Sequence, residues 1–260
     1  MNNYIGVTEF PGEKVPREQF ERLCHRYYWA SFFCKGKDVV EVACGSGFGA
    51  YFLSLHSKSF TAGDYSREMV EIAIKNTQHR INISQYDATQ MPYENNSKDV
   101  IIICEAIYYL PDVQLFFEEC KRVLRLSGKL LIVSANKDLV DFNPSPFSHK
   151  YLGVSELSNL LDNLNWRSQF FGYVDITKSS LRQEIFRPIK QLAVKLNLIP
   201  KTMDGKRFLK RLVFGKMVDV PRELSDGMMQ YKRPTEIIKN SPDRVHKVIY
   251  CLAEPNHNHK

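Results

Sequence analysis

The run from Val39 to Gly49 (V-V-E-V-A-C-G-S-G-F-G) constrains this chain more than any other segment. Its β-branched valines predict a buried parallel strand. Gly45, Gly47 and Gly49 then allow a tight turn that brings backbone N–H groups toward a ligand. Glu41, just ahead of the turn, indicates which kind of ligand. A carboxylate there can meet a cationic group, whereas a pyrophosphate site has no use for a further negative charge.

A second acid supports this interpretation. Asp64 follows Gly45 by 19 residues, at the end of a second short strand over 59–64. In a doubly wound sheet this spacing suits a side chain that accepts hydrogen bonds from ribose hydroxyls. A ligand with a ribose and a positively charged tail therefore fits better than a dinucleotide.

With these residues the chain resembles the class I S-adenosylmethionine-dependent methyltransferases, over roughly residues 20–175. The run before the glycines in that family is acid-x-G/A-x-G-x-G, and Glu41, Ala43, Gly45 and Gly47 supply it here. The resemblance implies S-adenosyl-L-methionine as the cofactor. It also implies an α/β fold with a doubly wound, seven-stranded Rossmann-like sheet of order 3-2-1-4-5-7-6, whose last two strands are antiparallel.

The hydrophobic pattern gives four parts. An N-terminal helical segment covers 1–35, a cofactor-binding core 36–176, an insertion between strands six and seven 177–243, and the final strand 244–254. Helices are predicted over 16–33, 47–55, 112–124 and 155–164, with a further helix capped by Ser66. Strands are predicted over 38–42, 59–64, 81–85, 99–104, 129–134, 170–176 and 245–253.

Composition limits the function classes. No run of 18 apolar residues is present, and 1–11 has no signal-peptide pattern, so we expect neither a membrane span nor export. Six scattered cysteines without a CxxC pair predict free thiols in a reducing cytoplasm and no metal site. The net charge of +7 comes from one segment, because 178–216 holds eleven Lys/Arg against two acids. We therefore expect no nucleic-acid partner.

The insertion leaves strand six, and ligands of parallel sheets bind outside the carboxyl ends of the strands. We expect it to act as a lid or substrate-binding cap, predicted to be helical and basic. An apolar stripe with basic residues beside it would either pack on the core or rest on an anionic membrane near the substrate, so the protein could sit peripherally at the inner membrane surface. The stripe consists of Leu181, Ile185, Ile189, Leu192 and Leu196.

The family resemblance assigns cofactor-binding residues. Glu41 would contact the methionine amine or orient the loop, Asp64 would bind the ribose, and Tyr65 would pack on the adenine. Asp87 would accept from the adenine amino group while the Ala88 N–H meets a ring nitrogen; an Asx turn is the alternative role for Asp87. The remaining residues would form the turn, line the methionine end or close over the cofactor: Ala43, Cys44, Gly45 and Gly47; Cys104 and Glu105; Arg26 and Tyr27.

The chemistry would be an in-line displacement that needs positioning above all, with a general base where the acceptor is a hydroxyl. His149, in the loop after strand five, is the candidate base, and Tyr108 and Tyr109 are candidates for the acceptor pocket. No (N/D)-P-P-(Y/F) run follows strand four, which argues against methylation of exocyclic base nitrogens. A small-molecule acceptor remains. A faint likeness of 143–151, 198–203 and 206–216 to methyltransferases of bacterial surface-glycan pathways favours a sugar hydroxyl.

Two other functions remain open. Gly45, Gly47 and Ala50 also match the G-x-G-x-x-A of an NAD-dependent oxidoreductase, which Glu41 and Asp87 disfavour. The alternative of another class is a non-catalytic protein that binds S-adenosylmethionine on the same fold. The sequence does not predict the oligomeric state.

Overall fold

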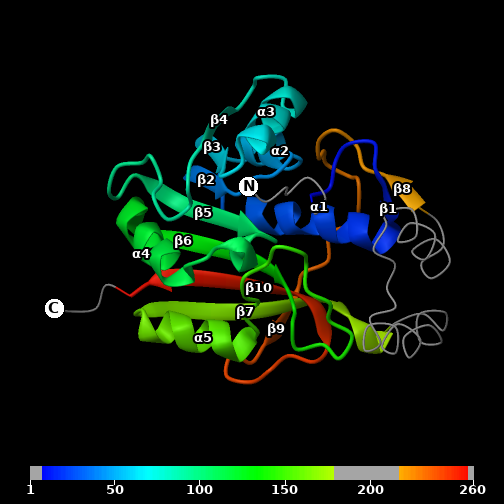
Figure 1. Cartoon of the computed structure of the whole chain (residues 1–260), viewed down its shortest axis with the longest axis vertical. Helices are drawn as coiled ribbons and strands as arrows, with labels where there is room; N and C mark the ends of the chain where they lie inside the picture. The colour runs from blue at the N-terminus through cyan, green and yellow to red at the C-terminus, as the bar shows by residue number, and fades with distance from the viewer. Residues whose placement is uncertain (1–7, 179–216, 257–260) are drawn as a thin grey trace.

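The computed structural model describes residues 8–178 and 217–256, and its centre is an eight-stranded mixed sheet (Figure 1). The strand order is β4-β3-β2-β5-β6-β10-β7-β9. Seven of these strands follow the predicted order 3-2-1-4-5-7-6, and the predicted count is wrong by one edge strand, β9. The sheet strands are β2 (Asp38–Val42), β3 (Ser59–Asp64), β4 (Asn82–Gln85), β5 (Lys98–Cys104), β6 (Leu124–Ala135), β7 (Trp166–Asp175), β9 (Thr235–Ile237) and β10 (His246–Pro255).

Strands β2 to β6 run parallel, and β10 is antiparallel to both of its neighbours, β6 and β7. A separate two-stranded sheet pairs β1 (Lys14–Pro16) with β8 (Met217–Asp219). The helices are α1 (Arg17–Ser31), α2 (Ala50–Leu55), α3 (Arg67–Asn76), α4 (Val113–Val123) and α5 (Val154–Asn163), with 3₁₀ turns at Ile107–Tyr109 and Ile176–Lys178.

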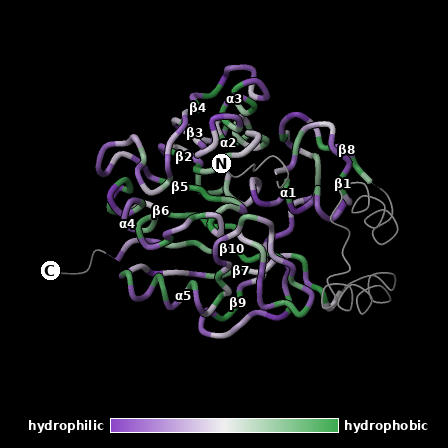
Figure 2. The backbone as a smooth tube through the Cα atoms, viewed as in Figure 1, coloured by the Kyte–Doolittle hydropathy of each residue, from purple (hydrophilic) through white to green (hydrophobic). Residues whose placement is uncertain are grey.

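The parallel strands are largely apolar along their length (Figure 2), because helices pack on both faces of the sheet. Alternate residues of β2 point to opposite sides. Val40 packs into the cluster that holds α4 and α5, whereas Val39 packs with α1 and α2. Glu41 lies two residues after Val39 and therefore on the same side of β2. This buried carboxylate points toward α1 and not along the ligand edge of the sheet.

Several boundaries differ from the predictions; the strand predicted over 170–176, for example, begins at Trp166. Helix α2 begins at Ala50 instead of residue 47, since Gly47 has a φ of +74° that an α-helix cannot contain. Strand β6 begins at Leu124, directly after α4, with a register shift against β5 between Lys98 and Val100.

Residues 217–243 of the predicted insertion contain the strands β8 and β9 and no helix, so the helical prediction is wrong for this part. The predicted apolar stripe from Leu181 to Leu196 lies outside the described residues.

Residues 217–232, here called the return segment, pack along α1. His25 is fully buried, its Nε2 lies 2.7 Å from the Lys232 carbonyl, and its Nδ1 lies 2.7 Å from the Tyr250 hydroxyl. The Tyr28 hydroxyl donates to the Ser225 carbonyl, and the Leu224 N–H donates to the Phe48 carbonyl in the glycine turn. The return segment therefore joins α1 to the turn that the sequence predicts to bind the cofactor.

Candidate functional site

A cavity of about 980 Å³ lies where the carboxyl ends of β2, β3 and β5 meet α1. Its lining includes fourteen of the predicted site residues: Arg26, Tyr27, Ala43, Cys44, Gly45, Asp64, Tyr65, Asp87, Ala88, Cys104, Glu105, Tyr108, Tyr109 and His149. Glu41 and Gly47 do not line it. Six acids and three arginines face this space, so the wall carries an excess of negative charge that suits a cationic ligand.

The glycine turn uses some of its N–H groups within the protein. The Gly45 N–H donates to Asp64 Oδ2 at 2.9 Å, and the Gly47 N–H donates to the Cys44 carbonyl at 3.0 Å. These two N–H groups are therefore already hydrogen bonded within the protein. Gly45 has a φ of +54°, and a Cβ on Gly47 would lie 3.0 Å from Ala73 on α3, so the two glycines permit the turn and the packing of α3.

Asp64 is fixed at the end of β3. Its Oδ1 accepts from the Ser66 N–H at 2.9 Å, and Ser66 in turn caps α3. Burial raises the pKa of this carboxyl, while the backbone N–H groups of Ser66, Gly45 and Tyr65 oppose that rise. Each oxygen keeps lone pairs that a pair of ribose hydroxyls can use. Tyr65, 60% exposed, lies beside it at the rim of the cavity.

Glu41 lies behind the cavity wall, and its contact is Tyr27. The Tyr27 hydroxyl is hydrogen bonded to Glu41, whose Oε2 atom is buried without a partner among the described residues. Burial raises the pKa of Glu41 to about 7. Gly49 makes room for this arrangement, since a Cβ there would lie 2.1 Å from the Tyr27 ring. Of the two predicted roles, the geometry fits orientation of the loop through Tyr27.

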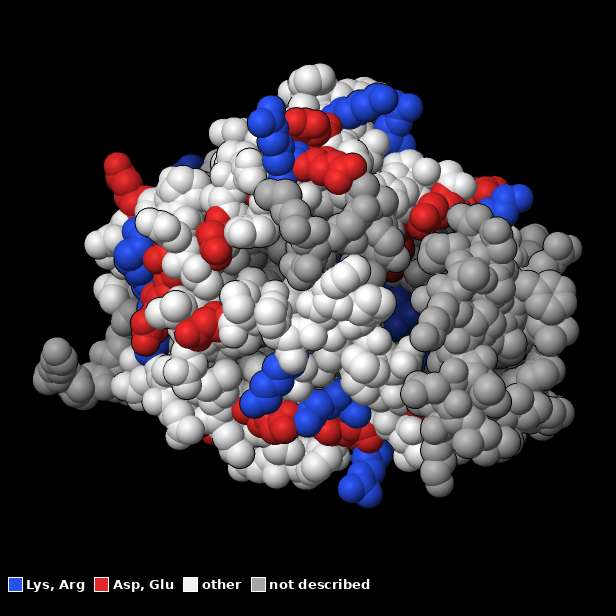
Figure 3. Space-filling model, viewed as in Figure 1, with Lys and Arg blue, Asp and Glu red and all other residues white. Residues whose placement is uncertain are grey.

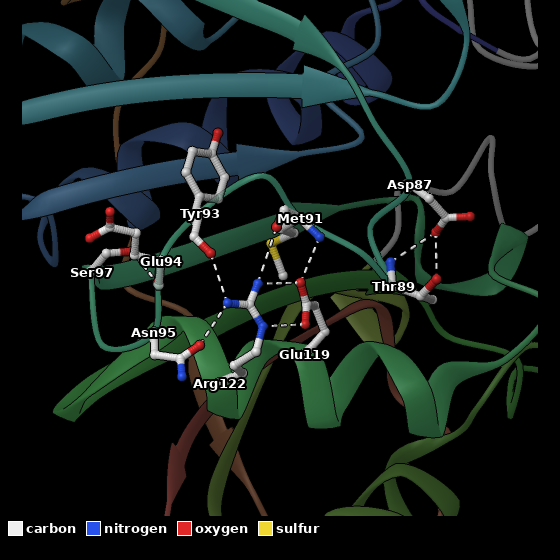
Figure 4. A network of polar contacts seen from close by, with 9 residues as sticks. All are labelled: Asp87, Thr89, Met91, Tyr93, Glu94, Asn95, Ser97, Glu119 and Arg122. Atoms are coloured by element: carbon white, nitrogen blue, oxygen red, sulfur yellow. Dashed lines mark hydrogen bonds and ion pairs between the residues drawn. The ribbon is translucent and has the colours of Figure 1, made fainter.

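Asp87 takes the position predicted for an adenine ligand, and it also forms the alternative Asx turn. Its Oδ1 accepts from the N–H and the hydroxyl of Thr89, both at 2.8 Å, while the other oxygen points away from Thr89 (Figure 4). The following loop is held by Arg122, which donates to the carbonyls of Met91 and Tyr93 and forms an ion pair with Glu119. The free oxygen of Asp87 is therefore available on a fixed loop.

The methionine end of the predicted site is formed by β5 and α1. Glu105 has a φ of +53°, and its Oε2 accepts from the Ala135 N–H and the Tyr108 hydroxyl, each at 3.1 Å. Burial raises its pKa, which Arg26 and Arg22 oppose. Arg26 lies 3.7 Å from Glu9, a residue that also accepts a hydrogen bond from Gln19.

An aromatic group forms the remaining wall. The rings of Tyr108 and Tyr151 stack at 4.0 Å, and the Tyr109 hydroxyl is hydrogen bonded to Ser145. The Tyr108 carbonyl accepts from the His149 N–H at 2.8 Å, which attaches the His149 loop to the end of β5. The exposed His149 imidazole makes no hydrogen bond to a described residue.

Sequence reasoning missed several lining residues. Thr8 and Glu9 come from the N-terminal segment, whose Glu9 carbonyl accepts from the Ser46 hydroxyl at 2.9 Å. No periodic pattern marks them. Gln19, Arg22 and Leu23 could have been found, because they precede Arg26 and Tyr27 at helical spacings and so share a face of α1.

The wall fits S-adenosylmethionine as a ligand. The Asp64 carboxylate lies at the position predicted for a ribose ligand, and the excess of acids suits a sulfonium and an amine. Among the described residues no group of three or more metal-ligating side chains occurs, and no metal site was predicted.

Comparisons with known proteins agree with this fit. Residues 40–132 match the family described as "Methyltransferase domain". A Mycobacterium tuberculosis protein named "Probable S-adenosylmethionine-dependent methyltransferase" is 30% identical over 182 residues, which are 68% of this chain and 63% of the relative. A Mycobacterium ulcerans phthiotriol/phenolphthiotriol dimycocerosates methyltransferase is 40% identical over 103 residues, 37% of this chain and 36% of the relative.

Solved structures share the fold. The Bacillus subtilis YcgJ protein superposes with a TM-score of 0.57 at 16% identity, covering 90% of this chain and 99% of that one. A SAM-dependent methyltransferase from Archaeoglobus fulgidus superposes with a TM-score of 0.53 at 17% identity, covering 91% of this chain and 92% of that one.

The chain spans about 63% of the length of the M. tuberculosis relative, so the comparison concerns the shared domain. That domain holds the glycine turn, Asp64 and the strands that carry them. Residues 40–132 therefore form a methyltransferase domain, and in this domain the chain is similar to the class I S-adenosylmethionine-dependent methyltransferases.

Proposed function

We propose that this protein transfers a methyl group from S-adenosylmethionine to a hydroxyl of a small molecule, and that the acceptor is a sugar or glycan precursor. The observation that carries the proposal is that one cavity joins the ribose carboxylate of Asp64 to a wall of Tyr108, Tyr109 and His149. The cofactor brings an activated methyl group on a sulfonium. Asp64 and Asp87 would hold its nucleoside, and Arg26 with Tyr27 its amino-acid end.

The protein's own groups supply position and a base. Tyr108 is fixed by Glu105 and by stacking on Tyr151, so the acceptor wall is rigid. The imidazole of His149 would take the proton of the acceptor hydroxyl. The acceptor class rests on the sequence likeness, and the mycobacterial relatives include one named for phthiotriol lipids, so a hydroxyl on a lipid is the competing acceptor.

The family match sets aside the oxidoreductase alternative. A non-catalytic protein that binds S-adenosylmethionine would differ from the proposed enzyme only in transferring no methyl group. We also propose a cytoplasmic location with peripheral contact at the inner membrane surface, supported by the eleven Lys/Arg in 178–216. No helix among the described residues is both long and apolar enough to cross a bilayer. On the face shown in Figure 3, the described basic and acidic side chains are intermingled.

Asp64→Asn should weaken binding of S-adenosylhomocysteine about ten- to a hundredfold, because the amide gives up one acceptor oxygen and the charge that strengthens hydrogen bonds to hydroxyls. Isothermal titration measures this. Asp112→Asn is the matched control, since it keeps the cap of α4 and lies outside the cavity. Binding of NADH without S-adenosylhomocysteine by the wild type would overturn the cofactor assignment.

Glu41→Gln should change how stability depends on pH. The folded pKa of about 7 lies above the ordinary 4.5, so the unfolded chain releases this proton first and wild-type stability falls as pH rises from 4.5 to 7. The glutamine variant lacks this loss, about 3 kcal/mol in total, and should gain relative to wild type by that amount between pH 4.5 and 8. Urea unfolding at pH 4.5 and pH 8 measures the free energies of unfolding, with the exposed Glu118→Gln as control. The same pH dependence of this free energy in Glu41→Gln and wild type would contradict the prediction.

His149→Gln should lower the rate of methyl transfer about a hundredfold or more while leaving affinity for S-adenosylhomocysteine unchanged. The assay follows label from methyl-labelled S-adenosylmethionine into a small-molecule extract and into its sugar fraction. His79→Gln, exposed and outside the cavity, is the control. Equal rates for His149→Gln and wild type reject the base, and binding without any transfer points to the non-catalytic alternative.

The chain should sediment with phosphatidylglycerol vesicles at low salt and not with phosphatidylcholine vesicles, because basic side chains near an anionic surface each contribute about 1 kcal/mol. Replacing Lys206, Arg207, Lys210 and Arg211 by glutamine should release it. Replacing the four lysines at positions 35, 37, 58 and 75 by glutamine should leave the protein bound to the vesicles. Equal sedimentation with both kinds of vesicle would reject electrostatic membrane contact.

A further inference from the structure

The cavity has two halves that the sheet order separates. The predicted nucleoside ligands Asp64 and Asp87 follow β3 and β4, on one side of the glycine turn. On the other side the order continues with β5, β6, β10 and β7. A ligand atom beyond the methionine end therefore lies over β5 to β7, and this half must receive the acceptor.

Helix α1 places a row of side chains on the cavity. Gln19, Arg22, Leu23, Arg26 and Tyr27 follow one another at spacings of three and one, so they form one face of the helix. Gln19 and Arg26 both contact Glu9. Arg22 stands between these two positions, one turn before Arg26.

Arg22 is the cavity arginine that has no counter-ion among the described residues. Arg26 lies 3.7 Å from Glu9, and Arg67 lies 3.0 Å from Glu71. The Nε atom of Arg22 is buried without a hydrogen bond, and its guanidinium makes no ion pair with a described residue. A guanidinium stays charged at any pH that a protein meets, so Arg22 brings a positive charge that forms no ion pair with a described residue into a wall that is otherwise rich in acids.

The surroundings of Arg22 place it in the acceptor half. Its charge acts on Glu105, at the end of β5, and on Tyr173, near the end of β7. Arg26 also acts on Glu105, but it is paired with Glu9 at 3.7 Å. Of the two arginines, Arg26 is thus held by an acid of the protein, and Arg22 has no such partner among the described residues.

We propose that Arg22 selects an acceptor that carries an anionic group, a phosphate or a carboxylate, close to the hydroxyl that is methylated. The inference rests on the proposed function and deepens it by naming the substrate class. Arginine binds both groups through two parallel N–H donors, so the contact would also orient the acceptor against the methyl group. Gln19, one turn before Arg22 on the same face, supplies a neutral neighbour at this position.

Titration of the full-length protein saturated with S-adenosylhomocysteine tests the proposal. The probes are inorganic phosphate, acetate, glucose 1-phosphate and methyl glucoside. The wild type should bind glucose 1-phosphate at least tenfold more tightly than methyl glucoside, and Arg22→Gln should remove that preference. Arg22→Lys keeps the charge and should restore part of it. Arg17→Gln, exposed on the same helix and paired with Glu21, is the matched control and should behave as wild type.

The remaining outcomes are decisive. Phosphate binding that exceeds acetate binding and depends on Arg22 supports a phosphorylated acceptor, and the reverse supports a carboxylate. Absence of phosphate and acetate binding, or equal binding by Arg22→Gln, overturns the proposal and leaves the cofactor assignment intact. A weaker affinity of Arg22→Gln for S-adenosylhomocysteine itself overturns it as well, because Arg22 would then belong to the cofactor carboxylate. Failure of the wild type to bind S-adenosylhomocysteine would instead reject the proposed function.

Discussion

The hydrogen bond between Glu41 and the Tyr27 hydroxyl connects the two parts of the chain on which the cavity depends. Glu41 belongs to the central strand β2, and Tyr27 belongs to α1, which packs on one face of the sheet and lines the cavity. A buried carboxylate is costly unless it is hydrogen bonded, so the pair favours one position of α1. The Tyr27 ring packs against Gly49, where the Cβ of any other residue would collide with it. The glycine run thus also serves to seat this helix.

The sequence predicted the sheet well because its signal is local. Each β-branched run, such as 99–104, is bounded by turn residues. The order of the strands was instead implied by the resemblance to the class I methyltransferases. β9 escaped prediction because Thr235–Ile237 is three residues long and carries no apolar alternation. Its pairing with β7 is a tertiary event that no local pattern records.

The site was predictable to the extent that motif and position coincide. Asp64 ends β3 and Asp87 lies two residues after β4, so their place on the ligand edge follows from the sheet alone. Glu41 was predicted, from its place before the glycine turn, either to contact the methionine amine or to orient the loop. Its direction depends on the side of β2 on which it lies, and Val39 on the same side packs on α1. Glu9 could not be found, since its approach to Arg26 depends on how the N-terminal segment crosses the turn.

The return segment shows why cofactor binding and the insertion cannot be independent. Its Leu224 N–H bonds the carbonyl of Phe48, its Glu223 pairs with Arg80 after α3, and its Lys232 carbonyl meets His25 on α1. These contacts reach three elements that carry cavity residues, at separations of 143 to 207 residues in sequence. Burial lowers the pKa of His25 to about 4, so this buried link is neutral near pH 7. A change in the return segment therefore acts on the glycine turn and on the Arg22 face of α1 together, which makes the insertion part of the site's framework.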